Sequence, residues 1–214
     1  MRKLTVIIFL CALLNAPRAS AQWDTALVRH SLKENLVMSG TSGVLIGCGF
    51  LAAYNPTVNS WAVSLRDEVM YHDPTKLHFD DQLQYVPMVA PWVLNLCGVK
   101  GRHNYNKLLL LEGGSYLLGS GWLNAAKYGF AKKRPDSSTY NSFPSGHTFT
   151  AFLGAEIVRR EFGKDYPWIA VAAYAVATLV GVMRIYNNRH WAGDVLAGAG
   201  LGILSTTLIY WAMD

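Results

Sequence analysis

The stretch "VGVMRIYNNRHWAGDVLAGAG", residues 180–200, places two arginines, two asparagines, a histidine and an aspartate between two uncharged runs. The run before it contains "WIAVAAYAVATLVGVM", and the run after it is "LAGAGLGILSTTLIYWAM". With their flanking residues they form segments 167–186 and 191–213, which have the length of roughly 20 residues that a helix needs to cross a bilayer. The sequence therefore predicts two membrane helices joined by a short polar connection.

Other segments have the same apolar character. Residues 84–99 and 107–127 are expected to form bilayer helices, and the shorter segment 147–158 is apolar apart from Glu156. Half of the 214 residues are hydrophobic and 15% are charged, which is apolar for a water-soluble domain. We expect an all-α, membrane-embedded bundle of about five to six hydrophobic helices. No linker divides it, so residues 22–214 are expected to form one domain.

The N-terminus is typical of a secretory signal peptide. "MRK" is a basic start, the 13-residue run "LTVIIFLCALLNA" is apolar, and "ASA" provides small residues for cleavage after Ala21. The alternative is a first membrane helix that is never cut, although the run is short for a span. Removal of residues 1–21 takes away Arg2, Lys3 and Arg18, so the formal charge falls from +5 to +2. Without a basic, aromatic-rich patch, a nucleic-acid partner is not expected.

Basic residues cluster in two connections, within 100–107 and 159–164. The positive-inside rule places both on the cytoplasmic side. Segments 127–147 and 184–194 then fall together on the exported side, which in a bacterium is the periplasmic face of the inner membrane. The sequence thus predicts that two remote polar segments share one face of the membrane.

Two segments before residue 84 are expected to lie near the membrane surface. If the signal is cleaved, no single full span can precede residues 84–99, and the 12-residue run 43–54 is then interfacial or re-entrant. Residues 58–69 form an amphipathic helix that lies either on the membrane or against the bundle. Its apolar positions are Val58, Trp61, Ala62, Leu65 and Val69.

Small residues and cysteines have mainly structural interpretations. Ser115 with Gly119, and Gly198 with Gly202, are pairs spaced four apart that favour close helix packing in membranes. Cys48 and Cys97 lie in apolar runs and are expected to be buried thiols.

One further cluster is a candidate metal site. It comprises Asp80, Asp81, His72 and His78, which lack the spacing of metal ligands and are expected to form a solvated loop. We therefore expect no metal ion and no cofactor.

Three polar fragments carry the candidate chemistry, and the first is "KYGFAKKRP". Lys127 and Arg134 are seven residues apart, two helical turns, so both cations are expected on one side of a helix that Pro135 ends. A basic pair of this kind, taken alone, is usually a solvated helix end.

The second fragment is "FPSGH", which ends at His147. The hydroxyl of Ser145 and the free backbone N–H groups around Gly146, at the start of a helix, form a candidate anion cradle. A histidine at this position can also serve only as a helix cap.

The third fragment lies in the opening stretch and contains Arg184, His190 and Asp194. The histidine and the aspartate are four residues apart and can touch on a helix. A carboxylate beside an imidazole fixes its tautomer and stabilises the imidazolium. The alternative is an interfacial salt bridge, although ionisable residues at the ends of membrane helices are functional candidates.

In this order, K-x6-R-P, P-S-G-H and R-x5-H-x3-D, the fragments resemble the motifs of the type 2 phosphatidic acid phosphatase family. The resemblance covers Lys127 to the C-terminus. Two departures are Met183, where the family usually has serine, and a connection of only eight residues between Pro135 and Pro144. Neither removes a catalytic group.

The resemblance implies a role for each residue. His190 would attack phosphorus and become a phosphohistidine, Asp194 would orient it, and His147 would protonate the leaving alkoxide. The phosphoryl oxygens would be held by Lys127, Arg134, Ser145, Gly146 and Arg184. Fixed cations suit a transition state that spreads negative charge over equatorial oxygens.

We therefore expect a metal-independent phosphoric monoester hydrolase that acts on a phosphorylated membrane lipid. The resemblance implies four candidate substrates: phosphatidic acid, phosphatidylglycerol phosphate, polyprenyl pyrophosphate and lipid A phosphates. The compact size and the leader resemble those of bacterial lipid A phosphatases. Alternatives are a soluble periplasmic acid phosphatase, a vanadium haloperoxidase and a non-enzymatic helical membrane protein.

Overall fold

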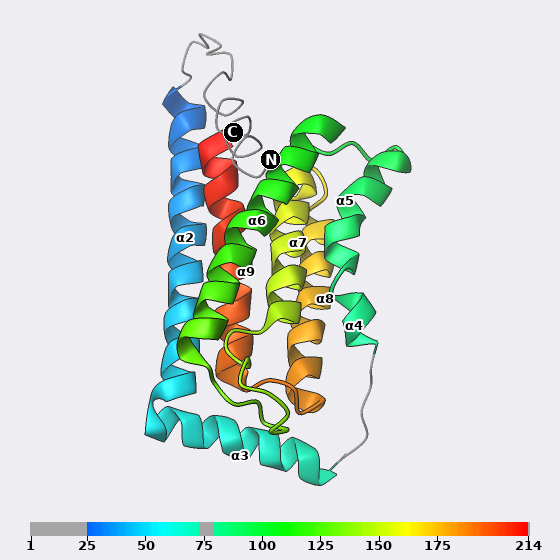
Figure 1. Ribbon diagram of the computed structural model, residues 1–214. Helices are drawn as coiled ribbons and strands as arrows, with labels where there is room; N and C mark the ends of the chain where they lie inside the picture. Colours follow the sequence, from blue (N-terminus) through cyan, green and yellow to red (C-terminus); the bar gives the residue numbers. More distant parts are fainter. Residues whose placement is uncertain (1–24, 73–78, 214) are drawn as a thin grey trace, which may run out of the picture. The chain divides into compact units, whose positions relative to one another are not determined.

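The computed structural model describes residues 25–72 and 79–213, and within them all regular structure is helical (Figure 1). The predicted signal peptide lies outside the described residues. The helices are α2 (Thr25–Tyr54), α3 (Pro56–His72), α4 (Asp80–Leu83), α5 (Val86–Leu96), α6 (Tyr105–Phe130), α7 (Gly146–Phe162), α8 (Pro167–Tyr186) and α9 (Ala192–Met213). The predicted all-α bundle is confirmed.

Helix α7 is the centre of the bundle, with α5, α6, α8 and α9 packed around it (Figure 1). Most of its residues are buried, and two core clusters meet on it. One side contributes Ala151 and Ala155 to a cluster with α8, and the other contributes Phe149 and Leu153 to a cluster with α6 and α9. Because both sides are covered by apolar side chains, α7 is held by burial rather than by its weak amphipathicity.

The predicted small-residue contacts are confirmed. A Cβ atom added at Gly202 would lie 2.5 Å from the carbonyl oxygen of Phe149, and one added at Gly119 would lie 2.4 Å from the Phe149 ring. A Cβ added at Gly198 would lie 2.5 Å from the carbonyl oxygen of Ser145, and Ser115 is fully buried. The helices α6, α7 and α9 can approach this closely only because these positions lack larger side chains.

Within residues 25–72 and 79–213, three helices are long and apolar enough to cross a membrane: Ser31–Tyr54 within α2, Pro167–Tyr186 and Ala192–Met213. The prediction that 43–54 is a short interfacial or re-entrant segment is therefore wrong. It counted only the uninterrupted apolar run, whereas Leu36, Val37 and Met38 extend that run backwards. The intervening Ser, Gly and Thr residues are compatible with a membrane helix, in which small residues are common.

The expected span 84–99 is also wrong. Helix α5 has only 11 residues, about 16 Å at 1.5 Å per residue, and cannot cross a bilayer alone. Tyr85 belongs to a turn that separates α4 from α5, and Gly98, with φ of 90°, follows the end of the helix. Gly154 of α7 packs against the backbone at the start of α5, where a Cβ would lie 2.4 Å from the nitrogen of Met88.

The remaining predicted helices agree with the structure. Residues 167–186 coincide with α8, and 107–127, 147–158 and 191–213 correspond to α6, α7 and α9, although α6 is not among the three candidate membrane spans. The amphipathic segment 58–69 lies within α3, which crosses the end of the bundle where α8 ends and α9 begins (Figure 1). The contacts of α3 with α8 and α9 favour the alternative in which this helix packs on the bundle.

The two basic clusters lie at the other end of the bundle (Figure 1), but Arg159 and Arg160 belong to the last turn of α7 instead of the connection that follows it. They are joined there, because the backbone N–H of Arg102 donates to the carbonyl of Glu161 at 3.0 Å and the ring of His103 bonds the Glu161 carboxylate at 2.8 Å. The expectation for the cysteines is wrong, since Cys48 and Cys97 are exposed, free thiols.

Candidate active site

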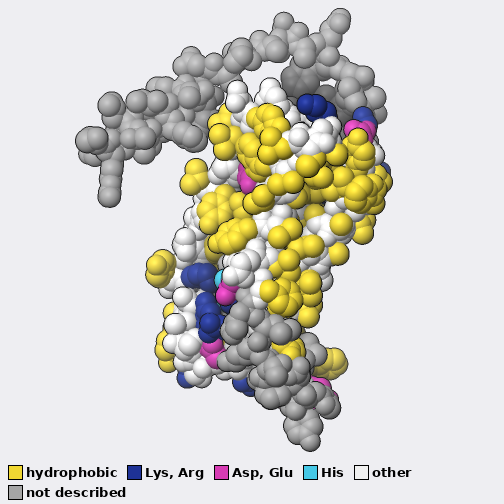
Figure 2. All heavy atoms as spheres, turned by 90° about the vertical axis from the view of Figure 1, so that its right-hand side faces the viewer, with side chains coloured by type: hydrophobic (Ala, Val, Ile, Leu, Met, Phe, Trp, Pro, Cys, Tyr) yellow, Lys and Arg dark blue, Asp and Glu magenta, His cyan; other side chains and the backbone are white. Residues whose placement is uncertain are grey.

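The three predicted fragments meet at the end of the bundle beside α3. The backbone N–H of Ser145, from the second fragment, donates to the carbonyl of Asp194, from the third, at 2.9 Å. The connection between α6 and α7 joins them through Ser142, whose hydroxyl bonds the Asp194 carboxylate. In Figure 2, lysine and arginine side chains gather with histidine and acidic side chains in the lower part of one face, below a largely hydrophobic surface. The fragments therefore form one polar site bordered by apolar helices.

His190 and Asp194 form a buried pair at the start of α9. The imidazole is 1% exposed, and its Nδ1 lies 3.5 Å from Oδ2 of the aspartate, which is fully buried. The same oxygen accepts the backbone N–H of Trp191 at 3.0 Å, as an acidic residue in the first turn of a helix commonly does. His190 itself precedes the helix. One carboxylate oxygen of Asp194 therefore both caps α9 and faces the imidazole of His190.

Lys132 belongs to this pair, although sequence reasoning missed it. Its Nζ lies 3.0 Å from Oδ1 of Asp194, and it stands 5.7 Å from the centre of the Trp191 ring. An ammonium beside a buried carboxylate offsets the cost of burying that charge. The only sequence signal was its place between the two predicted cations, Lys127 and Arg134, in the run "AKKRP".

Burial lowers the pKa of His190 to about 4, although the neighbouring Asp194 acts in the opposite direction. A histidine whose pKa is lowered is neutral at every pH above that value. At pH 7 the imidazole therefore has a lone pair for attack, as a nucleophile requires.

Lys127 and Arg134 meet, but not on one helix as predicted. Helix α6 ends at Phe130, and Ala131 follows in the left-handed region with φ of 43°, so Arg134 lies in the connection. Asn141 brings the two cations together: its carbonyl accepts from Lys127 Nζ at 2.7 Å and its side-chain oxygen from Arg134 Nε at 2.9 Å. The helix stops before proline can end it.

The "FPSGH" fragment forms the predicted helix start. Ser145 is the N-cap of α7, its hydroxyl accepts from the backbone N–H of Thr148, and α7 begins at Gly146. The contact of Gly198 with the Ser145 carbonyl holds this turn directly against α9. The first backbone N–H groups of α7 therefore have a fixed position beside Asp194.

Arg184 is buried and lies between two acidic residues of α4. Its NH1 is 2.5 Å from Oδ2 of Asp80 and 3.2 Å from Oδ1 of Asp81. The same Asp81 oxygen is 2.8 Å from Nε2 of His147. The prediction that Asp80 and Asp81 belong to a solvated loop is therefore wrong, because Asp80 is 1% exposed and both pair with candidate site residues.

The polar residues of the opening stretch that had no assignment have structural partners. Asn187 donates to Asp80 at 3.0 Å, and Asn188, in the left-handed region, accepts from Arg66 of α3 at 2.9 Å. Arg189 pairs with Asp136 at 2.9 Å. These bonds fix the connection between α8 and α9 to α4, to α3 and to the connection before α7.

No group of three or more His, Cys, Asp or Glu side chains is arranged to hold a metal ion within residues 25–72 and 79–213. The groups available at the site are cations, two imidazoles and helix-start N–H groups. Such groups can bind a tetrahedral oxyanion.

The fold and the candidate site together define a class: a helical membrane protein with a cluster of cations beside a buried histidine–aspartate pair. Comparison of the sequence with protein families is consistent with this class. Residues 122–214, the C-terminal part of the chain, match the model of the PAP2 superfamily. The match begins in α6 and covers all three fragments.

Curated relatives extend the likeness. The chain is 46% identical over 136 residues to a lipid A 1-phosphatase of Porphyromonas gingivalis, covering 63% of this chain and 31% of that protein. It is 32% identical over 95 residues to phosphatidylglycerophosphatase B of Bacillus subtilis, covering 41% and 46%. The chain thus spans about a third and under half of the lengths of these two relatives.

Two solved structures share the fold. One is LpxE of Aquifex aeolicus, with a TM-score of 0.52, 20% identity, and coverage of 68% of this chain and 93% of that one. The other is a transmembrane PAP2-type phosphatidylglycerolphosphate phosphatase of Bacillus subtilis, with a TM-score of 0.55, 22% identity, and coverage of 83% and 94%. This chain therefore shares the fold of these two proteins.

Proposed function

We propose that the protein hydrolyses a phosphomonoester or pyrophosphate of a membrane lipid. The observation that carries this proposal is the buried pair of His190 and Asp194 beside three candidate phosphate-binding cations, at the end of helices long and apolar enough to cross a membrane. Those cations are Lys127, Arg134 and Arg184. The names of the relatives, two of which are lipid phosphatases, support the same activity.

The reaction would proceed in two displacements. The neutral imidazole of His190 attacks phosphorus, an N–P bond forms, and the P–O bond to the lipid breaks. The alkoxide takes a proton from His147, and this help is typically worth about 10²–10⁴ in rate. Water then attacks phosphorus and gives its proton to His147; a new P–O bond forms, the N–P bond to His190 breaks, and phosphate leaves.

The phosphate oxygens would be held by fixed positive groups. Arg184 suits this role because its Nε is buried and has no hydrogen-bond partner among the described residues, so a donor remains for an incoming oxygen. The N–H groups of the Ser145–Gly146 turn lie at the start of α7, where the helix dipole favours an anion. These groups stabilise the charge that develops in the transition state.

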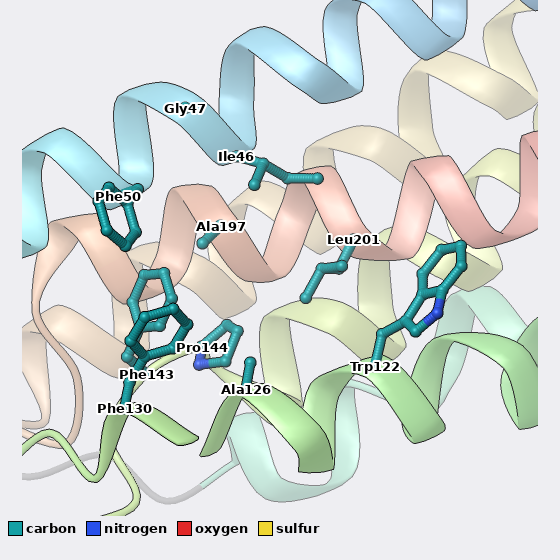
Figure 3. A pocket seen from close by; sticks show the side chains of 10 residues that line it. All are labelled: Ile46, Gly47, Phe50, Trp122, Ala126, Phe130, Phe143, Pro144, Ala197 and Leu201. Carbon is teal, nitrogen blue, oxygen red and sulfur yellow. The ribbon is translucent and has the colours of Figure 1, made fainter. Parts of the chain in front are cut away.

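A lipid substrate, rather than a small soluble ester, is favoured by an apolar groove beside the site (Figure 3). The groove has a volume of about 390 Å³ and lies among α2, α6 and α9. Phe130 and Phe143 stand together at one end and Trp122 stands at the other. Its walls also include Pro144, which directly precedes the Ser145 turn. The groove thus runs from the phosphate site along the membrane helices, where an acyl chain would lie.

The proposed function predicts release of phosphate by the purified full chain from a lipid phosphate, with a chelator present. Offering phosphatidic acid, phosphatidylglycerol phosphate, a polyprenyl pyrophosphate and lipid A beside p-nitrophenyl phosphate tests it. We expect at least one lipid to be turned over with the highest kcat/KM. Turnover of the small ester alone would favour a soluble-type acid phosphatase, and no turnover of any ester would contradict the proposal.

Filling the groove should separate lipid from soluble substrates. Gly47 lines the groove, and a Cβ added there meets nothing within 4 Å, so Gly47→Trp places an indole in the groove without a clash at the backbone. We expect kcat/KM for the lipid to fall about tenfold or more, since each methylene misplaced in an apolar pocket costs about 1–3 kcal/mol. Activity on p-nitrophenyl phosphate should persist. Gly43→Trp, one turn away on the same helix and equally open, is the matched control.

We further infer that the site faces the periplasm and that the protein resides in the bacterial inner membrane. The basic connections lie at the end of the bundle away from the site, and such connections favour the cytoplasm. Ser138, exposed in the connection beside the site, offers a test. With the native cysteines replaced by serine, since Cys48 and Cys97 are exposed thiols, a membrane-impermeant maleimide should label Ser138→Cys in cells whose outer membrane alone is permeabilised. Labelling only after the inner membrane is broken would reverse the orientation.

A further inference from the structure

Asp81 occupies a position that the substrate needs. Its Oδ1 lies 2.8 Å from Nε2 of His147 and 3.2 Å from NH1 of Arg184. In the proposed reaction the histidine protonates the leaving oxygen and the arginine binds phosphoryl oxygens. One carboxylate oxygen between these two groups therefore stands where an oxygen of the phosphoester would stand.

Asp80 has a different environment, although it is the adjacent residue. It is 1% exposed, whereas the side chain of Asp81 is 52% exposed. Both carboxylate oxygens of Asp80 are engaged, Oδ2 with Arg184 at 2.5 Å and Oδ1 with the side-chain nitrogen of Asn187 at 3.0 Å. Asp80 makes no bond to His147 among the described contacts. Asp80 thus fixes the buried Arg184 side chain through bonds within the protein.

We propose that Asp81 is a built-in competitor of the substrate phosphate, which must leave His147 and Arg184 when phosphate binds, whereas Asp80 is a positioning residue that holds Arg184 in both states. The proposal rests on the proposed function, because it takes these two residues as the phosphate-contacting groups. It explains why two neighbouring acids lie in a site built for an anion.

Electrostatics favour the exchange. Asp81 brings a single negative charge, whereas a phosphate monoester has nearly two and presents several oxygens to Lys127, Arg134 and Arg184 together. A half-exposed carboxylate returns to water at little cost, while removal of a buried one leaves a buried cation without its partner. Of the two acids, only Asp81 can therefore move away from Arg184 and His147 at low cost.

The two acids should have opposite effects on phosphate binding. Orthophosphate is titrated calorimetrically into the purified full chain, and KM and kcat are measured for the best lipid substrate. For Asp81→Ala we expect orthophosphate to bind about two- to fivefold tighter and KM to fall by a similar factor, the size expected from loss of a half-exposed ion pair. For Asp80→Ala we expect weaker binding and a loss of about 100-fold in kcat/KM, since a catalytic group is misplaced.

Asp67→Ala is the matched control for charge. Asp67 lies on α3 at the same end of the bundle, is 57% exposed and pairs with Arg66, so its removal changes the net charge equally without touching His147 or Arg184. We expect less than half of the gain in phosphate affinity seen with Asp81→Ala. An equal gain in phosphate affinity in Asp67→Ala would show that the gain comes from the change in net charge alone, and it would overturn the proposal.

Other outcomes are equally decisive. Unchanged or weaker phosphate binding in Asp81→Ala would show that this carboxylate supports the site instead of competing for it. Full activity in Asp80→Ala would remove the positioning role. Wild-type protein that neither binds orthophosphate nor releases it from any ester would contradict the proposed function itself, and the two failures are thereby distinguishable.

Discussion

Replacement of His190 by glutamine is expected to abolish phosphate release, with kcat/KM falling by more than about 10⁴-fold, because the attacking nitrogen is lost. The wild-type protein, quenched during turnover of a labelled substrate, should hold an acid-labile phosphoryl group, and His190→Gln should hold none. The variant should still bind orthophosphate, since the cations that would hold it are unchanged. Retention of turnover in His190→Gln would falsify the assignment of the nucleophile.

His103→Gln is the matched histidine control. This residue lies at the other end of the bundle, where its ring bonds Glu161 at 2.8 Å, and its loss should leave phosphoryl trapping intact. The pH dependence follows from burial, which lowers the pKa of His190 to about 4. Titration by NMR, assigned with His190→Gln, should show this imidazole neutral down to about pH 4. Protonation near pH 6.5, as for a free imidazole, would contradict the buried environment.

The second largest effect is expected for Asp194→Asn. The change keeps the shape of the side chain but removes the charge that faces Nδ1 of His190 at 3.5 Å. Loss of the carboxylate from a comparable histidine–aspartate pair lowers kcat by about 10⁴, because the imidazole adopts the wrong tautomer. We expect kcat to fall about 10³–10⁴-fold and KM to change little. If a variant of a distant buried residue lost as much kcat as Asp194→Asn, the loss would reflect misfolding and would contradict the orienting role of Asp194.

Lys132→Met tests the ion pair of Asp194 separately from its contact with the His190 imidazole. Lys132 contacts Oδ1 of Asp194, whereas Oδ2 faces the imidazole, so the variant removes a neighbouring charge and leaves the orienting oxygen in place. A smaller loss, about tenfold, is expected. Thermal unfolding of both variants in detergent should be followed in parallel, since Asp194 also caps α9 through the N–H of Trp191.

Helix positions could be predicted where the apolar pattern alone determines them. Helix α8 was predicted to the residue, because Pro167 starts it and Arg184 with the following asparagines ends the apolar run. Helix α2 could not be predicted, because small polar residues interrupt its apolar pattern without interrupting the helix. For α5 the pattern was equally apolar, but a turn at Tyr85 and Gly98 shortens the helix, and apolar periodicity does not report such ends.

The candidate site could be predicted where the contributing residues are close in sequence. His190 and Asp194 are four residues apart, and their pairing follows from helical spacing. Asp80 and Asp81 contact Arg184 across more than 100 residues, and Lys132 contacts Asp194 across 62. Contacts of this kind depend on how helices pack, so one sequence does not reveal them. The motifs identified the cations and imidazoles, but not Asp80 and Asp81, the acids that pair with Arg184.

The glycine contacts of α9 have a consequence for how a bulky substrate can arrive. Gly198 and Gly202 place the backbone of α9 directly on that of α7, and Gly193 meets α2 in the same way, 2.6 Å from a carbonyl oxygen for an added Cβ. Helices joined backbone to backbone cannot slide without opening a void, so the imidazole, its aspartate and the Ser145 turn form one rigid body. If the proposed function holds, admission of a lipid headgroup falls to the elements that contact this body through side chains alone. Of these, α4 carries the two aspartates that contact Arg184 and His147.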